Sequence, residues 1–136
     1  MGSATHADVH HLYEPQVSVT ADARIDDVQA LWRMLRRSTD PATPPSVAHL
    51  IARAYTRWGT DLGRHVLGDY ALAIWDARKQ RLVLIRDIIG IRPLFYTCIP
   101  GGVAFASTVR SLLAHPQVVP QVNETAVARY LMHATT

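Results

Sequence analysis

The chain has 136 residues, of which 49% are hydrophobic and 18% are charged. This is about the length of one domain, and the composition excludes disordered and collagen-like proteins. No apolar run approaches the roughly 18 to 20 residues of a membrane span, so we expect no membrane partner. The first residues carry no secretory signal and the chain has one cysteine, which together predict a cytoplasmic protein without disulfides.

The formal net charge is +3, and all the basic residues except Lys79 are arginines spread along the chain. One cluster, over residues 33–37, falls in a helical pattern and is interpreted as a solvated helix face. Nucleic-acid binding requires a stripe of positive charge or aromatic residues that stack on bases. The sequence has neither, so we expect no nucleic-acid partner.

The first half of the chain predicts one strand and two helices. Residues 1–16 have no hydrophobic period and are expected to form a flexible arm. Alternating polar and apolar residues then predict a strand over 16–21. Apolar residues at helical spacing predict helices over about 27–37 and 46–58, and Ser46 is the expected cap of the second helix.

The second half changes to strand patterns separated by polar turns. Two hairpins and two short helices are predicted, at 65–76 with 81–87, 94–98 with 103–107, 108–114 and 123–133. The expected core includes Tyr70, Leu72, Ile74, Leu82, Leu84, Phe95 and Phe105, with Trp58 or Trp75 between sheet and helix. This order of elements predicts an α+β fold in which antiparallel sheets pack against helices.

Two groups of residues are candidate chemical sites. His6, Asp8, His10 and His11 include residue types that bind zinc or nickel, but the surrounding segment offers little to hold such ligands rigidly. Adventitious metal binding or none is therefore favoured over a metal site. Cys98 lies in an apolar strand with no adjacent base, so a small buried hydrophobe is favoured over a nucleophile.

A charged corner follows the first hairpin, with Arg86 and Asp87 before a glycine and Arg92 after it. One interpretation is that Asp87 pairs with Arg92 or Arg86 to brace a turn in which Gly90 adopts a positive φ. The other is a surface that docks a partner or a phosphate. The chemistry of the residues favours bracing.

Several segments resemble, in one colinear order over residues 17–133, the glutaminase domain of asparagine synthetases. They are Leu67–Asp76, Arg81–Asp87, Gly90–Tyr96, Phe105–Ser107 and Leu112–Pro116. That domain is a class II glutamine amidotransferase of the N-terminal-nucleophile hydrolase superfamily. The resemblance implies two antiparallel sheets sandwiched between helices, here with the first strands of the domain missing.

The resemblance also shows where this sequence departs from the family. Family members use an N-terminal cysteine, whereas Gly2 follows the initial methionine and Ser3 would need an extra cleavage. The Asn-Gly pair of the oxyanion hole falls at Asp22 and Ala23, and the acidic residue that holds the glutamine amino group falls at Val47. These replacements imply a degenerate glutamine site with no catalytic residue, so we expect the chain not to be an enzyme by itself.

The shortened domain, in which residues 20–27 replace the catalytic loop, resembles the degenerate glutaminase-like domain of lasso-peptide cyclases. In those proteins a C-terminal synthetase domain uses ATP to activate a carboxylate. The resemblance implies a glutaminase-like domain over 17–118 and, over 119–136, the beginning of a linker and helix of a synthetase domain that is absent. ATP and Mg are expected only in that absent domain, and this chain is expected to bind no cofactor.

The expected partner is an ATP-dependent synthetase domain or protein acting in trans, or a second copy of the chain in a homo-oligomer. Candidate interface residues are Arg86, Asp87, Arg92, Tyr130 and Leu131. Two alternatives remain open. One is a working amidohydrolase that uses Cys98 or a processed Ser3 as nucleophile. The other is a stand-alone module that binds a peptide or small ligand.

Overall fold

The computed structural model describes residues 9–13, 16–44 and 46–133. The chain divides into two compact units, Met1–Leu94 and Phe95–Thr136. Each unit has its own antiparallel sheet, with four strands in the first and two in the second. The predicted α+β class is therefore confirmed.

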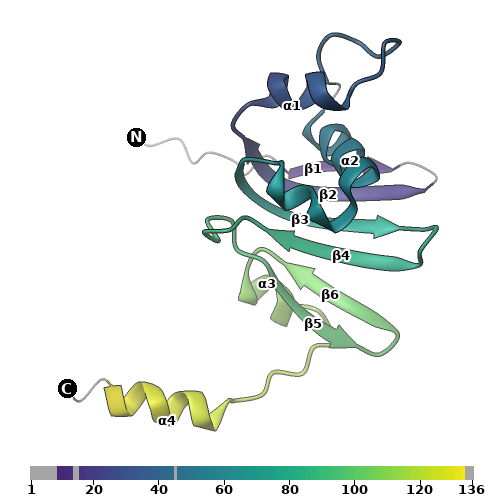
Figure 1. Ribbon diagram of the computed structural model, residues 1–136. Helices are drawn as coiled ribbons and strands as arrows, with labels where there is room; N and C mark the ends of the chain where they lie inside the picture. Colours follow the sequence, from purple (N-terminus) through teal and green to yellow (C-terminus); the bar gives the residue numbers. More distant parts are fainter. Residues whose placement is uncertain (1–8, 14–15, 45, 134–136) are drawn as a thin grey trace, which may run out of the picture. The chain divides into compact units, whose positions relative to one another are not determined.

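The four-stranded sheet of the first unit has the order β1-β2-β3-β4 (Figure 1). Its strands are β1 (Val9–Tyr13), β2 (Val17–Ile25), β3 (Gly68–Asp76) and β4 (Arg81–Arg86). β2 pairs with β3 along its whole length, from Val17 opposite Asp76 to Ile25 opposite Gly68. β1 pairs with β2 over residues 9–13, so the expectation of a flexible arm over 1–16 is wrong for this part.

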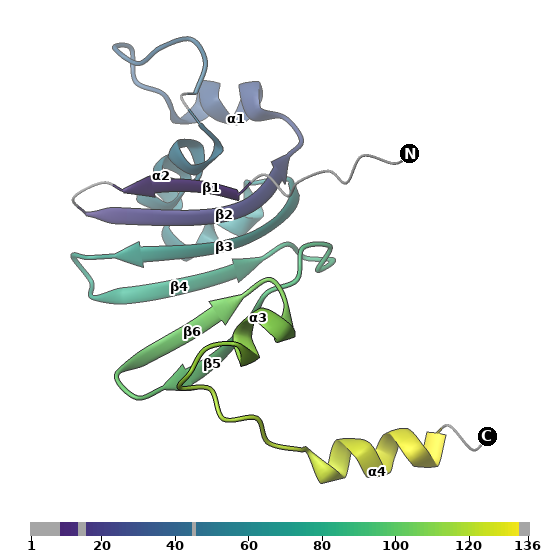
Figure 2. The same cartoon turned by 180° about the vertical axis from the view of Figure 1, so that it is seen from behind.

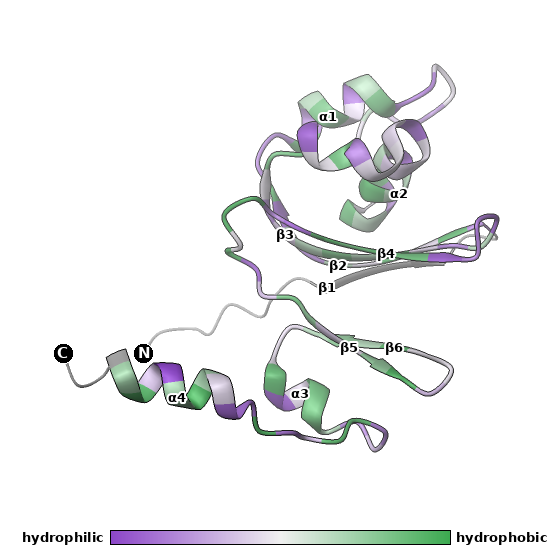
Figure 3. Ribbon diagram, turned by 60° about the horizontal axis from the view of Figure 1, so that its bottom comes forward, coloured by the Kyte–Doolittle hydropathy of each residue, from purple (hydrophilic) through white to green (hydrophobic). Residues whose placement is uncertain are grey.

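Two helices cover one face of this sheet (Figure 3). They are α1 (Val28–Leu35) and α2 (Val47–Trp58), and the 3-10 helix η1 (Gly59–Arg64) follows α2. The Asp27 carboxylate accepts a hydrogen bond from the Ala30 amide at the start of α1. At the start of α2 the Ser46 hydroxyl accepts one from the His49 amide, which confirms the predicted cap.

The core lies between the helices and the sheet. The largest fully buried side chains are Trp32, Leu50, Ile51, Leu62, Leu72, Ile74, Val19 and Val66. Alternate residues of β2 and β3 face the helices because side chains on a strand alternate between its two faces. Burial of each large apolar side chain contributes about 1.5 to 3 kcal/mol to folding.

The expected core is confirmed on β3 and wrong on β4. Tyr70, Leu72 and Ile74 are buried as predicted. On β4 the partly buried Leu82 and Leu84 are not in the core, whereas Val83 is. The reason is the register: Val83 lies opposite Ile74, and directly paired residues share one face of a sheet. Trp58 packs against this core, but Trp75 is 40% exposed.

The described part of the second unit, up to residue 133, contains a hairpin and two helices (Figure 2). Its elements are β5 (Phe95–Ile99), β6 (Gly102–Ala106), α3 (Val109–Leu113) and α4 (Glu124–His133). Phe95 and Phe105 are 39% and 37% exposed, and Cys98 is exposed, so their expected burial is wrong. A two-stranded hairpin with one five-residue helix has too little apolar surface to enclose both faces.

Helix α4 begins after Asn123, whose side-chain oxygen accepts a hydrogen bond from the Ala126 amide. Its described side chains, over residues 124–132, are all exposed. No helix within the described ranges is long and apolar enough to cross a membrane.

Candidate functional site

Asp22 lies near the end of β2, inside a sheet rather than in a loop. It is directly opposite Ala71 on β3, and Ala71 is opposite Arg86 on β4. The three side chains therefore share one face, with neighbouring strands about 4.8 Å apart. This face is the one opposite the helices, because the neighbouring Ala21, Ala23 and Tyr70 belong to the core.

The Asp22 side chain is only 11% exposed and forms an ion pair with Arg92. Nη1 of Arg92 is 3.3 Å from Oδ1 of Asp22. Neither Asp22 Oδ1 nor Arg92 Nε has a hydrogen-bond partner in the described part of the chain. The pair is thus held by charge rather than by an aligned hydrogen bond, and removal of Arg92 would leave a buried carboxylate uncompensated.

Asp87 holds the turn from which Arg92 reaches Asp22. Its carboxylate accepts hydrogen bonds from the backbone amides of Gly90, Ile91, Arg92 and Tyr70. Burial alone would raise the pKa of Asp87, but the four amide donors outweigh it and lower the pKa to about 2. A charged carboxylate therefore fixes both the end of the hairpin and the path of the loop.

Gly90 and Arg86 complete this turn. Gly90 has a φ of +77°, and a Cβ atom at this position would lie 2.9 Å from the Arg86 guanidinium. The positive φ of Gly90 is confirmed, and Asp87 does brace the turn, but through backbone amides and not through the predicted pairing with the side chain of Arg92 or Arg86. The Arg92 guanidinium pairs with Asp22 instead of Asp87, and it is the Arg92 amide that Asp87 binds.

The turn displays three isoleucines that the sequence analysis did not single out. Ile88, Ile89 and Ile91 are 101%, 80% and 55% exposed. The sequence signal for this surface is a run of apolar residues at a turn between charged residues, because loop tips are usually polar. We call residues 87–92 the Asp87 turn, and its exposed apolar side chains form a candidate contact surface.

The other two degenerate positions lie in regular structure as well. Ala23 is buried in β2 opposite Tyr70, and Val47 is the first residue of α2, where it packs against the core. The segment over 20–27 was expected to replace a loop, but β2 continues through residue 25. Asp22 and Ala23 are thus constrained by pairing with β3.

The remaining candidate residues lie in β1, in the second unit or outside the described residues. Tyr130 and Leu131 are 74% and 60% exposed on α4, in the second unit. Cys98 lies on β5, opposite Val103. Ser3, His6 and Asp8 fall outside the described residues, and His10 and His11 lie in β1. Within the described ranges, no three His, Cys, Asp or Glu residues are grouped so that they could hold a metal ion.

Comparison with known families gives a match over most of the chain. Residues 16–136 match the model of a glutamine amidotransferase domain. Asparagine synthetase (glutamine-hydrolyzing) 3 of Bacillus subtilis (strain 168) is 27% identical over 117 residues, which are 86% of this chain and 18% of that protein.

Two further relatives match shorter regions. Asparagine synthetase (glutamine-hydrolyzing) 2 of the same organism is 37% identical over 78 residues, 57% of this chain and 10% of the relative. Amidase chyE of Penicillium rubens is 33% identical over 69 residues, 51% of this chain and 10% of the relative. The chain thus spans less than a fifth of the length of these relatives.

Proposed function

The chain belongs to the glutamine amidotransferase domain family, and from this premise we propose that it is a member without glutaminase activity. We further propose that it serves as the accessory half of an ATP-dependent synthetase that forms amides, such as a lasso-peptide cyclase. Its antiparallel sheets and helices agree with the N-terminal-nucleophile-hydrolase-like fold of such domains.

The observation that carries the proposal is the buried, ion-paired carboxylate of Asp22. The resemblance places Asp22 at the position of the oxyanion-hole asparagine. Hydrolysis needs hydrogen-bond donors there, aimed at the negative charge that develops in the transition state. A carboxylate has only acceptors when ionised, and its charge repels an oxyanion. Loss of a single oxyanion donor typically costs about 10²- to 10³-fold in rate.

Val47 supports the same conclusion for substrate binding. It stands where the resemblance places the acidic group that pairs with the substrate ammonium. Its side chain is apolar and packs against the core, so it offers no acceptor and no compensating charge. Glutamine would therefore lose both an anchor for its amino group and the stabilisation of its transition state.

The accessory role is supported by the Asp87 turn and by the relatives. Ile88 and Ile89 are exposed on a turn held by four amide hydrogen bonds to one carboxylate, which suits a preformed contact surface for a partner. The relatives named as asparagine synthetases have more than four fifths of their length outside the matched region. Tyr130 and Leu131 on α4 are a second proposed contact, and self-association is the competing arrangement.

ATP and Mg are assigned to that partner and not to this chain. The described residues offer no group of three carboxylates or histidines for a metal ion. The sequence also lacks the Ser-Gly-Gly-x-Asp-Ser pyrophosphate loop that such synthetase domains carry.

The test is glutamine hydrolysis by the purified chain. We expect ammonia release equal to a no-protein control, while the Bacillus subtilis relative serves as the active control. Ammonia release above background that is lost in Cys98→Ala would overturn the proposal, because it would make Cys98 a nucleophile.

The rate of amide formation by a synthetase tests the accessory role separately. A synthetase from the same genome that lacks a glutaminase-like domain should form amide faster when this chain is added. Ile89→Asp should weaken the effect, whereas Met34→Asp, at a 52% exposed position on α1, should not. Equal rates with and without the chain would contradict the accessory role but leave the absence of glutaminase activity standing.

A further inference from the structure

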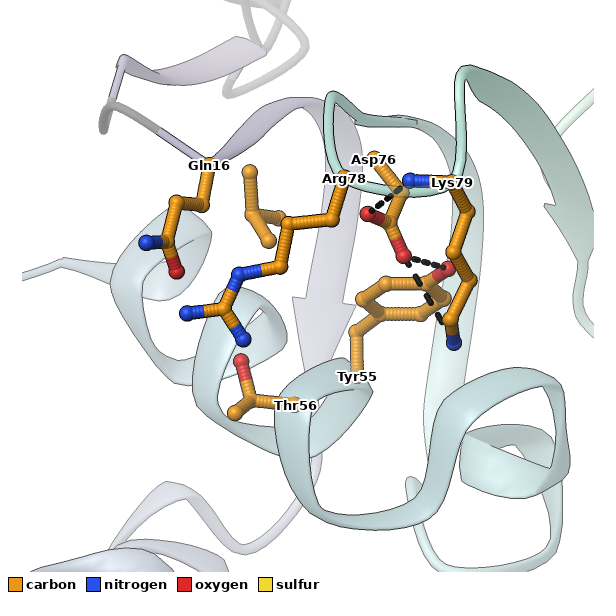
Figure 4. Close-up of a pocket in the computed structure, with 7 residues that line it drawn as sticks. Gln16, Tyr55, Thr56, Asp76, Arg78 and Lys79 are labelled. Atoms are coloured by element: carbon orange, nitrogen blue, oxygen red, sulfur yellow. Dashed lines mark hydrogen bonds and ion pairs between the residues drawn. The ribbon is translucent and has the colours of Figure 1, made fainter.

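A second polar cluster lies at the end of the sheet where β2 begins and β3 ends (Figure 4). It surrounds a cavity of about 120 Å³. The residues that line it include Gln16, Tyr55, Thr56, Asp76, Arg78 and Lys79. None of them belongs to the Asp22 site or to the Asp87 turn.

One side of this cavity is an internally satisfied network around Asp76. Its carboxylate accepts a 2.8 Å hydrogen bond from the Tyr55 hydroxyl and a 3.2 Å hydrogen bond from the Lys79 amide. The Lys79 ammonium lies 3.6 Å from the same carboxylate, and Arg81 donates to the Tyr55 hydroxyl at 3.1 Å. Asp76 is therefore a fixed anion whose charge is already matched by its neighbours.

The other side of the cavity carries the guanidinium of Arg78. Figure 4 shows the Arg78 guanidinium between the Gln16 carboxamide and the Tyr55 ring. Within the described residues, the Arg78 side chain makes no hydrogen bond or ion pair. The Thr56 hydroxyl already donates its hydrogen to the Ala52 carbonyl at 2.8 Å, so it is not available as a donor to a ligand in the cavity.

Among the described residues at the cavity, positive charges outnumber negative ones. Arg78 and Lys79 line the cavity with two positive charges against the one negative charge of Asp76, and Arg81 adds a third positive charge behind Tyr55. A guanidinium offers a planar fork of donors that matches a carboxylate or phosphate, and a carboxamide adds a neutral donor. The cavity volume suits a group of a few heavy atoms, since one water occupies about 30 Å³ in the liquid.

We propose that this cavity binds a small oxyanion, the phosphate or carboxylate group of a ligand. The Arg78 guanidinium is its main contact, the Gln16 amide donates a further hydrogen bond, and the Lys79 ammonium adds attraction while it remains paired with Asp76. Tyr55 and Asp76 hold Lys79 in place and do not contact the anion.

This site is separate from the positions of the degenerate glutamine site. Tyr55 is eight residues beyond Val47 on α2, which is about 12 Å along the helix axis. Val17, at the start of β2, is five residues from Asp22, which is about 17 Å along the strand. The inference therefore does not depend on whether the chain hydrolyses glutamine.

The experiment is a titration of the whole, isotope-labelled chain, followed by the NMR shifts of its backbone amides. Sodium phosphate and sodium acetate are the two probes, and sodium chloride at matched ionic strength is the reference. We expect saturable shifts at residues 77–80 with at least one probe. A phosphate-only response identifies a phosphoryl ligand, and an acetate-only response identifies a carboxylate ligand.

Three variants make the result decisive. Arg78→Gln should weaken binding about tenfold, as expected for the loss of a charge-assisted hydrogen bond. Arg78→Lys should recover part of the affinity because it keeps the charge but not the fork. Arg36→Gln, at an exposed position after α1, should bind like the wild type. No saturable shift with either probe, or equal binding by Arg78→Gln and Arg36→Gln, would overturn the proposal.

Discussion

The Tyr55 hydroxyl on α2 donates a hydrogen bond of 2.8 Å to the carboxylate of Asp76 at the end of β3. Both residues are buried, at 3% and 4% exposure. The hydrogen bond lowers the pKa of Asp76 most strongly among its neighbours, more than the Lys79 amide and ammonium do. One contact thus fixes the last turns of α2 to the sheet and keeps the carboxylate charged.

Tyr55→Phe should remove this contact with little change in shape. We expect a loss of about 1 to 3 kcal/mol in the free energy of unfolding, because a buried acceptor loses its donor. Urea denaturation measures the change. Tyr96→Phe, at a 66% exposed position on β5, is the matched control and should leave the stability within about 0.5 kcal/mol of wild type. Equal effects of the two variants would contradict the prediction.

The Asp22–Arg92 ion pair should show measurable coupling in a double-mutant cycle of Asp22→Ala and Arg92→Ala. We expect a coupling energy of about 1 to 2 kcal/mol, since the pair is largely shielded from water and each single variant leaves a charge without its partner. The Arg24–Asp26 pair, 59% and 51% exposed, is the control. Its coupling should be at most about 0.5 kcal/mol. Equal coupling in both cycles would mean that Asp22 is better solvated than the structure indicates.

Asp87 makes stability depend on pH in the acid range. Its pKa is about 2 in the folded chain against an ordinary value of 3.8, so the charged form is favoured by folding. Its contribution is fully present above pH 3.8 and is lost as the pH falls through 2. Asp87→Asn should therefore lower stability at neutral pH and flatten the fall in stability across this window. An acid unfolding curve with the wild-type slope would refute this.

Ile74→Ala should destabilise the first unit by about 2 to 5 kcal/mol, because the side chain is fully buried between β3 and the helices. Ile89→Ala, at an 80% exposed position in the Asp87 turn, should change stability by less than about 0.5 kcal/mol. Thermal unfolding followed by circular dichroism distinguishes the two. An unchanged midpoint for Ile74→Ala would place β3 outside the core.

Local patterns were enough to predict most elements. Ser46 followed by apolar residues at helical spacing predicted α2, and the polar residues 77–80 between two apolar runs predicted the first hairpin. The core face of β4 could not be predicted, because the residues from Leu82 to Ile85 are all apolar and alternate in no visible way. Only the pairing of Val83 with Ile74 decides it.

Long-range partners explain the rest of the differences. Asp22 was located as a degenerate position, but the sequence does not show that Arg92, seventy residues later, compensates its charge. β1 has little hydrophobic pattern and exists through pairing with β2. Cys98 is exposed because little of the hairpin is covered by other elements. The residues of β5 alone do not indicate how much of the hairpin will be covered.

The Asp87 turn has a consequence for the kinetics of recognition. Ordering a backbone residue costs about 1 to 2 kcal/mol in conformational entropy, and here the hydrogen bonds to one carboxylate meet that cost during folding. A partner that contacts Ile88 and Ile89 would encounter side chains on a backbone that is already fixed. Association would then require no prior search of loop conformations, and its rate would be set by diffusion and orientation alone.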